Sequence, residues 1–259
     1  MKSHEPGGNA HMTDQSLTNR TRETGKLWLR RALQRADIEI GRGPYASRLV
    51  KTLQSRRLDT MLDIGANVGQ YAVLTRSAGF SGTIISCEPL DGAFDELNQR
   101  ASRDECWTAL KTAVGAEPGT ATINVSQNSF SSSIRDMTAA HLDTAPQSRY
   151  IATEEVPVTT VRDLVTSHDL DPARTLLKID TQGFEGEVLR GAGDLIGQVG
   201  AIQLELSFVE LYDGQLLFDE LVARMSADGY RIQQLEPGIS DRNGRMLQVD
   251  GLFVRLADD

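Results

Sequence analysis

Short apolar runs alternate with amphipathic segments through the middle of the chain. Five runs have the length and composition of buried strands: Thr60 to Ile64, Thr83 to Cys87, Thr108 to Gly115, Leu176 to Asp180 and Ala201 to Leu206. The segments between and after them have helical patterns: residues 68–75, 91–101, 160–167, 185–190 and 216–226. Strands that alternate with helices predict an α/β fold whose mostly parallel sheet is covered by helices on both faces.

Other apolar runs modify this picture. Tyr230 to Leu235 and Leu247 to Leu256 are separated by glycine-containing turns, which predicts an antiparallel C-terminal hairpin with a long loop. Thr120 to Val125 alternates like a strand, and Val156-Pro157-Val158 predicts a short edge strand because proline lacks an N–H donor. Residues 126–155 form a polar insertion between them, and its length is typical either of a lid or substrate loop or of a plain surface loop.

The N-terminal part of the chain differs in composition from the rest. Residues 1–24 are polar, which predicts a disordered tail. Residues 25–57 are predicted to form a basic helical extension, and residues 58–259 are long enough for one domain with its own core. Residues 26–40 are both basic and amphipathic, so this helix either contacts an anionic membrane surface or packs on the domain edge with a solvated basic face.

The charge of the chain is unevenly distributed. Residues 20–57 hold 11 Lys and Arg against 3 Asp and Glu, whereas residues 58–259 hold 15 against 31. An acidic main domain argues against nucleic acid as the principal substrate. No apolar run approaches the roughly 20 residues that span a bilayer. Cys87 and Cys106 lack metal-ligand spacing, and free thiols fit a cytoplasmic protein, peripheral to the inner face of a membrane if the basic helix binds lipid.

The first predicted strand ends in a glycine-containing turn that opens into a helix. Asp63 lies near the end of this strand, and the turn carries Gly65, Asn67 and Gly69. Such a turn brings backbone N–H groups and a helix N-terminus close to a ligand at the carboxyl ends of parallel strands. Asn67 and Gln70 stand where the dinucleotide pattern G-x-G-x-x-G requires glycine, so the turn matches an NAD site poorly.

The second predicted strand ends at Glu88-Pro89. An acidic residue in this place accepts hydrogen bonds from ribose hydroxyls. Together with the turn, Glu88 therefore indicates a nucleoside without a pyrophosphate, such as S-adenosylmethionine (SAM). The alternative is an ordinary βαβ turn followed by a surface glutamate.

Five segments carry a resemblance to one family: residues 63–70, Glu88-Pro89, Ser131-Ser132-Ser133, residues 177–186 and residues 248–255. Together they resemble the FkbM-type SAM-dependent methyltransferases over about residues 58–256. The resemblance implies a Rossmann-like class I methyltransferase fold and O-methylation, often of a sugar hydroxyl on a glycolipid or natural product. Many relatives carry Asp-Val-Glu-Gly where this chain has Asp180-Thr181-Gln182-Gly183, so Gln182 cannot supply any charge that the glutamate provides in them.

The motifs suggest how SAM would be bound. We expect Gly65, Asn67 and Gly69 to line the methionine end of SAM, with Asp63 hydrogen-bonding there through the turn. Glu88 is expected to hold the ribose.

Methylation of a hydroxyl also needs a group that removes or polarises the proton. Asp180 is a candidate base, or a Mg²⁺ ligand together with Glu205. Alternatively, Asp180 caps the following turn and Glu205 pairs with a neighbouring basic side chain. His141 in the polar insertion is a further candidate base, although a lone histidine in a loop is more often only solvated.

Rival functions stay open at this point. The leading hypothesis is O-methylation of a sugar, and the nearest alternative is methylation of another small hydroxylated metabolite. An NAD-linked oxidoreductase is disfavoured by the glycine turn. A catalytically silent nucleoside-binding protein would bind SAM and methylate nothing.

Overall fold

The centre of the molecule is a seven-stranded sheet in which six strands run in the same direction. The computed structural model describes residues 44–128 and 130–256. The strand order is β3-β2-β1-β7-β8-β10-β9. The strands are β1 (Thr60–Ile64), β2 (Thr83–Cys87), β3 (Trp107–Leu110), β7 (Thr175–Ile179), β8 (Ala201–Ser207), β9 (Tyr230–Pro237) and β10 (Gln248–Arg255). The order of the strands reverses between β1 and β7, which is where open α/β sheets bind ligands.

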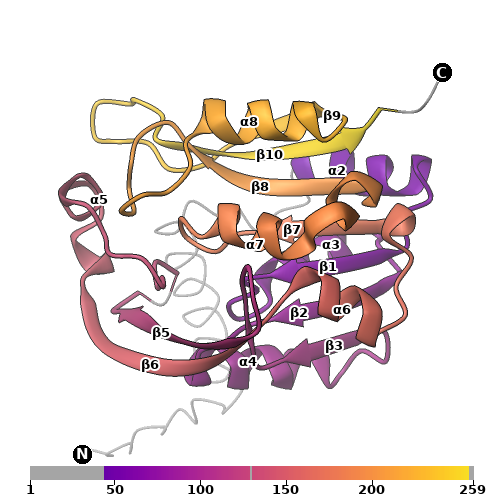
Figure 1. The fold of residues 1–259 in the computed structure, drawn as a ribbon, viewed down its shortest axis with the longest axis horizontal. Helices are drawn as coiled ribbons and strands as arrows, with labels where there is room; N and C mark the ends of the chain where they lie inside the picture. The colour runs from indigo at the N-terminus through magenta and orange to yellow at the C-terminus, as the bar shows by residue number, and fades with distance from the viewer. Residues whose placement is uncertain (1–43, 129, 257–259) are drawn as a thin grey trace, which may run out of the picture. The chain divides into compact units, whose positions relative to one another are not determined.

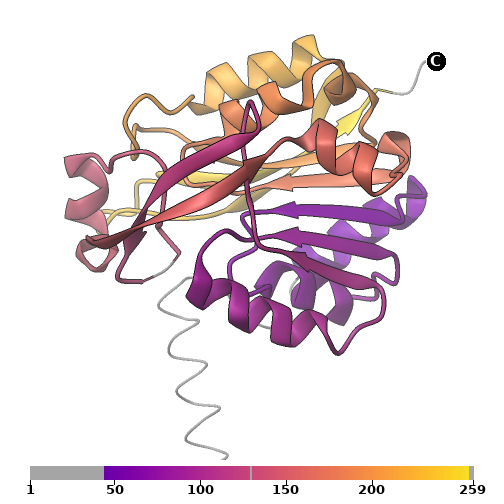
Figure 2. The ribbon, with the colours of Figure 1, turned by 60° about the horizontal axis from the view of Figure 1, so that its bottom comes forward.

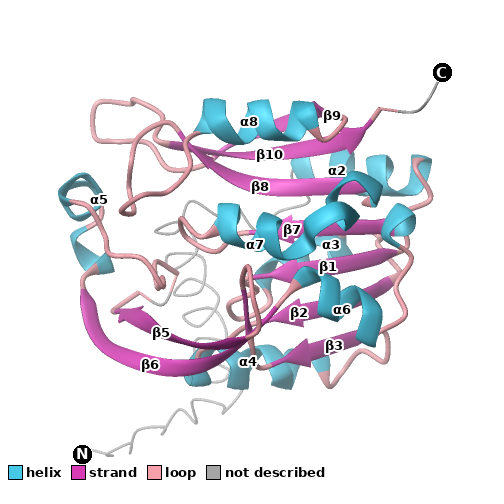
Figure 3. Ribbon diagram, viewed as in Figure 1, coloured by secondary structure: helices cyan, strands magenta, loops and turns pink. Residues whose placement is uncertain are grey.

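Helices cover both faces of this sheet, as Figures 1 and 3 show. One face is covered by α2 (Pro44–Ser55), α3 (Gln70–Ser77) and α4 (Asp91–Ala101). The other face is covered by α6 (Val161–Ser167), α7 (Glu185–Ala192), the short η3 (Gly193–Gln198) and α8 (Phe218–Ala227). A further short helix, η2 (Pro172–Arg174), precedes β7. The predicted fold class, a mostly parallel sheet with helices on both faces and an antiparallel C-terminal pair, is confirmed.

The prediction of one continuous third strand is wrong. The apolar run from Thr108 to Gly115 divides into β3, which pairs with β2, and β4 (Ala113–Val114), which belongs to a second sheet. The backbone N–H of Thr112 donates to the carbonyl of Leu110 at 3.1 Å, which makes a tight turn between the two pieces. The run is therefore continuous in hydrophobicity but not in hydrogen bonding.

The second sheet has the order β4-β6-β5, with β5 (Gly119–Ser126) and β6 (Tyr150–Thr159) as its long strands. The short edge strand predicted around Pro157 is thus wrong, because this proline lies in the long central strand β6. It is tolerated there because β4 pairs only with Val158 and Thr159. Thr112, which precedes β4, lies beside Pro157, and its side chain donates to the proline carbonyl. No backbone hydrogen bond between strands on this side of β6 therefore requires the N–H that proline lacks.

The polar insertion forms one end of the molecule's second sheet and carries α5 (Ala139–Thr144) and η1 (Pro146–Ser148). It lies toward the edge at which the parallel strands end (Figures 1 and 2). The side-chain amide of Asn128 donates to the hydroxyls of Ser131 and Ser148. The hydroxyl of Ser133 donates to the backbone carbonyl of Gln182 at 2.7 Å. The described residues of the insertion are therefore hydrogen-bonded to each other and to the turn that follows β7.

The chain enters the described region through α2, whose Leu49 and Leu53 are fully buried in the same core as β1 and β7. The predicted tail over 1–24 and the amphipathic segment 26–40 lie outside the described residues. Within the part of the chain that the structure describes, no helix is long and apolar enough to cross a bilayer.

Candidate functional site

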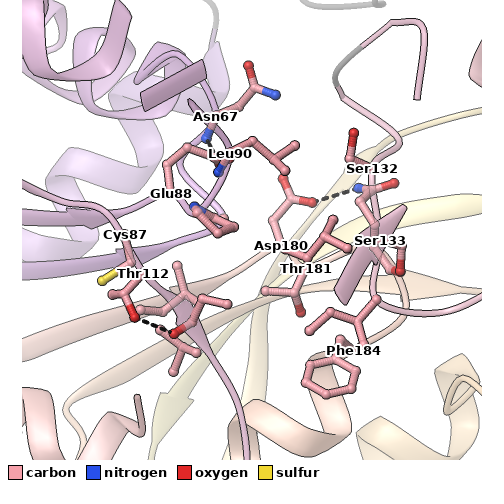
Figure 4. Close-up of a pocket in the computed structure, with 18 of the residues that line it drawn as sticks. Asn67, Cys87, Glu88, Leu90, Thr112, Ser132, Ser133, Asp180, Thr181 and Phe184 are labelled. Carbon is pink, nitrogen blue, oxygen red and sulfur yellow. Dashed lines mark hydrogen bonds between the residues drawn. The ribbon is translucent and has the colours of Figure 1, made fainter. Parts of the chain in front are cut away.

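An open pocket lies at the carboxyl ends of β1, β2 and β7. Its wall is formed by the first glycine turn, the end of β2, the insertion with the second sheet, and the turn after β7. The lining residues are Ile64, Gly65, Asn67, Gln70, Cys87, Glu88, Pro89, Leu90, Thr112, Ala113, Val114, Ile123, Phe130, Ser132, Ser133, Ile134, Asp180, Thr181, Gln182 and Phe184. Figure 4 shows Asn67 and Glu88 on one side, Ser132 and Ser133 on the other, and Asp180 between them.

The glycine turn has a conformation that explains its residues. Gly65, Asn67 and Gly69 have φ angles of 73°, 48° and 81°, in the left-handed region that glycine adopts without strain and asparagine tolerates. A Cβ atom on Gly65 would lie 1.9 Å from the carbonyl oxygen of Asp180, so the turn after β1 touches the end of β7. Gly65 and Asn67 line the pocket as predicted. Gly69 does not, because it packs against Trp107.

Glu88 lines the pocket, but very little of it is exposed to solvent. Its side chain is buried, and its two carboxylate oxygens accept hydrogen bonds from the backbone N–H groups of Asn67, at 2.9 Å, and Leu90, at 3.0 Å. Burial raises the pKa of Glu88 to about 7 in spite of these two donors. Each carboxylate oxygen keeps a free lone pair, so Glu88 can both fix the turn and accept a hydroxyl of a bound nucleoside.

Asp63 does not line the pocket. Its fully buried side chain points to the face of the sheet covered by α2 and α3. There it lies 3.1 Å from Nζ of Lys178 and accepts a hydrogen bond from Ser86. Asp63 thus reaches the ligand side only through other groups.

Lys178 is the group through which Asp63 acts, and sequence reasoning missed it. Its buried Nζ lies 3.0 Å from the carbonyl oxygen of Gly65 and 3.5 Å from Oδ2 of Asp180. Burial by itself lowers the pKa of Lys178, but the carboxylates of Asp63 and Asp180 more than offset this, so the pKa of Lys178 is raised and the ammonium is retained. One cation therefore holds both the glycine turn and the carboxylate that follows β7.

Asp180 and Glu205 are brought together by Gln182. The side-chain nitrogen of Gln182 donates to Oδ1 of Asp180 at 2.8 Å and to Oε2 of Glu205 at 3.0 Å. Asp180 is about one third exposed and lines the pocket, whereas Glu205 does not line it. Burial, followed by the nearby charges of Asp180 and Glu185, raises the pKa of Glu205 well above its ordinary value.

The proposed magnesium site at Asp180 and Glu205 does not fit this arrangement. Mg²⁺ requires oxygen ligands, but an N–H donor of Gln182 stands between the two carboxylates. Among residues 44–128 and 130–256, no group of three or more His, Cys, Asp or Glu side chains is arranged to hold a metal ion. The expectation of Mg²⁺ is therefore not supported.

His141 does not line the pocket. Its ring is buried edge-on against Tyr212, with the ring centroids 5.0 Å apart. Burial lowers the pKa of His141 to about 4. Its Nδ1 has no hydrogen-bond partner among the described residues. A neutral imidazole without contact to the pocket has no direct route to an acceptor hydroxyl.

Comparisons with known proteins identify the family of the chain. A family model described as the methyltransferase FkbM domain matches residues 63–232. No curated protein matches the chain. Similar solved structures include a magnesium protoporphyrin IX methyltransferase from Synechocystis with bound SAM, at 13% identity and a TM-score of 0.45. That match covers 96% of this chain and 100% of the other. A second is a 1,6-didemethyltoxoflavin N1-methyltransferase from Burkholderia thailandensis, at 10% identity and a TM-score of 0.42, covering 98% of this chain and 94% of the other.

The sheet order and the glycine turn at its switch point define a Rossmann-like class I methyltransferase fold. The family model covers more than half of the chain, and the chain belongs to the FkbM family of SAM-dependent methyltransferases.

Proposed function

We propose that the protein is an O-methyltransferase that methylates a sugar hydroxyl, on a glycolipid or a glycosylated natural product. The observation that carries this proposal is the position of Asp180, a partly exposed carboxylate on the pocket wall between the glycine turn and the serines of the insertion. A sugar hydroxyl is a weak nucleophile at neutral pH, and a carboxylate beside it can take its proton during the reaction.

In this proposal, Glu88 accepts hydrogen bonds from the ribose of SAM, while the backbone of Gly65 and Asn67 lines the methionine end. SAM supplies a methyl group activated by its sulfonium. Asp180 orients the acceptor hydroxyl, accepts its proton as the carbon–oxygen bond forms and the carbon–sulfur bond breaks, and returns the proton to solvent. Lys178 keeps Asp180 turned toward the pocket through their 3.5 Å contact.

The composition of the acceptor side of the pocket supports a sugar. The hydroxyl oxygens of Ser132 and Ser133 can accept hydrogen bonds, and Phe130 and Phe184 offer aromatic surface, which together suit a ring bearing several hydroxyls. The charged residues among the described lining residues are Glu88 and Asp180, both acidic. We therefore propose neutral acceptors over phosphorylated or carboxylated ones, because an anion there would face carboxylates and no lining cation.

The sequence also predicts which partners the protein has: an acceptor other than nucleic acid, and a membrane surface if the acceptor is a glycolipid. The acidic charge of residues 58–259 disfavours nucleic acid as an acceptor. A glycolipid acceptor would be reached at a membrane surface, for which residues 26–40 are the candidate contact. Sedimentation with anionic and neutral vesicles would test this, since equal partitioning to both would contradict an electrostatic contact.

The first test is calorimetric titration of the full chain with S-adenosylhomocysteine, with NAD as the comparison ligand. Micromolar affinity for the former alone, roughly −8 kcal/mol, is the expected result. A preference for NAD would contradict the proposal that SAM is the methyl donor.

Turnover is then tested with methyl-labelled SAM and a panel of neutral glycosides, phosphorylated sugars and non-sugar alcohols. Methylation of non-sugar alcohols alone would contradict the acceptor class. Asp180→Asn should retain S-adenosylhomocysteine binding and reduce kcat by about 10²–10⁴-fold, the usual contribution of a positioned base. An unchanged kcat in this variant would show that Asp180 is not the base.

A further inference from the structure

Gln182 occupies a strained and closely held position in the turn after β7. Its φ angle is 54°, which is unfavourable for a residue with a long side chain. The hydroxyl of Ser133 donates to its backbone carbonyl at 2.7 Å. A Cβ atom on the adjacent Gly183 would lie 2.6 Å from Cβ of Tyr212, so the turn is also packed against that side chain. This conformation is held by contacts from two other parts of the chain.

The strained backbone places the amide group between three hydrogen-bonding partners. The amide nitrogen donates to Asp180 and Glu205, at 2.8 and 3.0 Å, and the amide oxygen accepts from the hydroxyl of Tyr212 at 2.7 Å. This orientation fits the available groups, because the amide nitrogen can only donate, while the tyrosine hydroxyl can donate to the amide oxygen. Tyr212 thus fixes which end of the amide faces the two carboxylates.

The amide of Gln182 also lies between two carboxyl groups that would repel each other when charged, and a glutamate at this position would add a third. Glu205 is partly buried near the charges of Asp180, Glu185 and Asp250, and the pKa of Glu205 is already raised. A third carboxylate at residue 182 would lie at hydrogen-bond distance from both carboxylates that the amide now contacts. Lys178 contacts Asp180 but has no ion pair with Glu205 among the described residues. The two side-chain N–H groups of Gln182 therefore allow the carboxyl groups of Asp180 and Glu205 to lie close together.

We propose that Gln182 is the positioning residue of the acceptor site. Its amide, oriented by Tyr212, joins the carboxylates of Asp180 and Glu205 and keeps Asp180 directed into the pocket. This inference rests on the proposed function for the meaning of Asp180, but the carboxylate arrangement itself can be measured without any ligand.

The test is the titration of side-chain carboxyl carbons by NMR in the full-length protein. The variants are Gln182→Ala, Gln182→Glu and Tyr212→Phe, with Gln198→Ala, at an exposed position outside the site, as the matched control. Removing donors that favour the charged form should raise the titration midpoints measured at Glu205 by about one pH unit in Gln182→Ala, and by more in Gln182→Glu. Tyr212→Phe should shift them less, and Gln198→Ala not at all. The groups that also face Asp180 and Glu205, namely Lys178, Glu185 and Asp250, are unchanged in every variant.

Kinetics with an accepted glycoside provide the second readout. Gln182→Glu should move the acidic limb of the kcat profile to higher pH, with the KM for SAM unchanged within about threefold. A purely structural role would lower stability without moving this profile.

The outcomes separate the two proposals. Unshifted midpoints in both Gln182 variants, or an unshifted kcat profile, would overturn the role of Gln182 while leaving the methyltransferase intact. Absence of S-adenosylhomocysteine binding by the wild type would overturn the proposed function, and the carboxyl titration would still report on the amide. If Gln182→Ala does not fold, Tyr212→Phe, which removes one hydroxyl and keeps the ring, decides the question: wild-type midpoints in that variant overturn the proposal.

Discussion

The two faces of the central sheet are built from the same strands, yet they bury different chemistry near the carboxyl edge. The face under α6, α7 and α8 stays apolar along its strands, with Leu62, Ile64, Leu177, Ile179, Leu204 and Leu206 all buried. The face under α2 and α3 begins apolar, with Met61, Leu176 and Ala201. It then becomes polar toward the same edge, with Asp63, Lys178, Gln203, Glu205 and Asp250.

This difference shows how one sheet combines a stable core with a charged site. The apolar face contributes burial energy that does not depend on pH. The polar half of the other face has one lysine among several carboxylates, and the hydroxyls of Tyr45 and Tyr71 donate to the side-chain oxygen of Gln203. Charges that are buried there must be paired or neutralised. The pocket opens where this polar half reaches the strand ends.

Breaking the buried ion pair should have the largest effect. Lys178→Met leaves the charge of Asp63 buried without its cation and should destabilise the protein by about 3–5 kcal/mol. It should also weaken S-adenosylhomocysteine binding, because the Gly65 carbonyl loses its donor. Urea unfolding measures the first effect and calorimetry the second. Adding Asp63→Leu should restore much of the stability, and no recovery in the double variant would contradict this account.

A cavity on the apolar face should cost nearly as much stability without affecting the ligand. Leu177→Ala is expected to lower the free energy of unfolding by about 2–5 kcal/mol. The affinity for S-adenosylhomocysteine should stay within a few-fold of the wild type in protein that is still folded. Val73→Ala on the exposed side of α3 serves as the control, with a change below about 0.5 kcal/mol. A large loss of affinity in Leu177→Ala would show that the two faces are not independent.

The polar half should also make stability depend on pH through Asp250. Burial, followed by the charge of Asp180, raises the pKa of Asp250 to about 7. A carboxyl whose pKa is higher in the folded state stabilises the fold fully below its unfolded pKa, and this stabilisation is lost as the pH rises through about 7. Asp250→Asn should therefore match the wild type near pH 4 and exceed it by about 2–4 kcal/mol at pH 8.

Urea unfolding of the wild type and Asp250→Asn at the two pH values tests this prediction. Glu88, whose pKa is also raised, is present in both proteins, so its contribution cancels in the difference. A constant difference across the pH range would contradict the assignment.

The smallest expected effect concerns the ligand and not the fold. Glu88→Ala should weaken S-adenosylhomocysteine binding by about 1–3 kcal/mol, the cost of a lost charged hydrogen bond. The affinity of the wild type should also fall as the pH is lowered through about 7, where Glu88 becomes protonated, and the affinity of the variant should not. Calorimetry at pH 6 and pH 8 compares the two proteins, and equal affinities at pH 8 would exclude Glu88 from the ribose site.

Local patterns predicted a large part of this fold. The strands from Thr60 to Ile64 and from Thr83 to Cys87, and the helix over residues 91–101, occur with the predicted bounds because short apolar runs and helical spacing are local properties. The division of residues 108–115 was not predictable in this way. It depends on pairing with β6, some 45 residues later in the chain, and hydrophobicity does not say which sheet a residue joins.

The site was predicted less completely for the same reason. Gly65, Asn67, Glu88 and Asp180 line the pocket because their motifs lie at strand ends. Asp63 lies one residue before the end of β1, and strand alternation turns its side chain to the α2–α3 face instead of toward the ligand. The contacts of Gln182 with Glu205 and Tyr212 join residues 23 and 30 positions apart, which no local pattern reveals.

The close approach of Gly65 to Asp180 has a consequence for how two ligands share the pocket. The glycine that shapes the turn after β1 leaves no space for a Cβ beside the Asp180 carbonyl, and Lys178 joins the same two residues. A ligand that shifts the turn therefore also shifts Asp180. Donor and acceptor should bind with a coupling free energy, and linkage requires that each change the affinity of the other by the same factor.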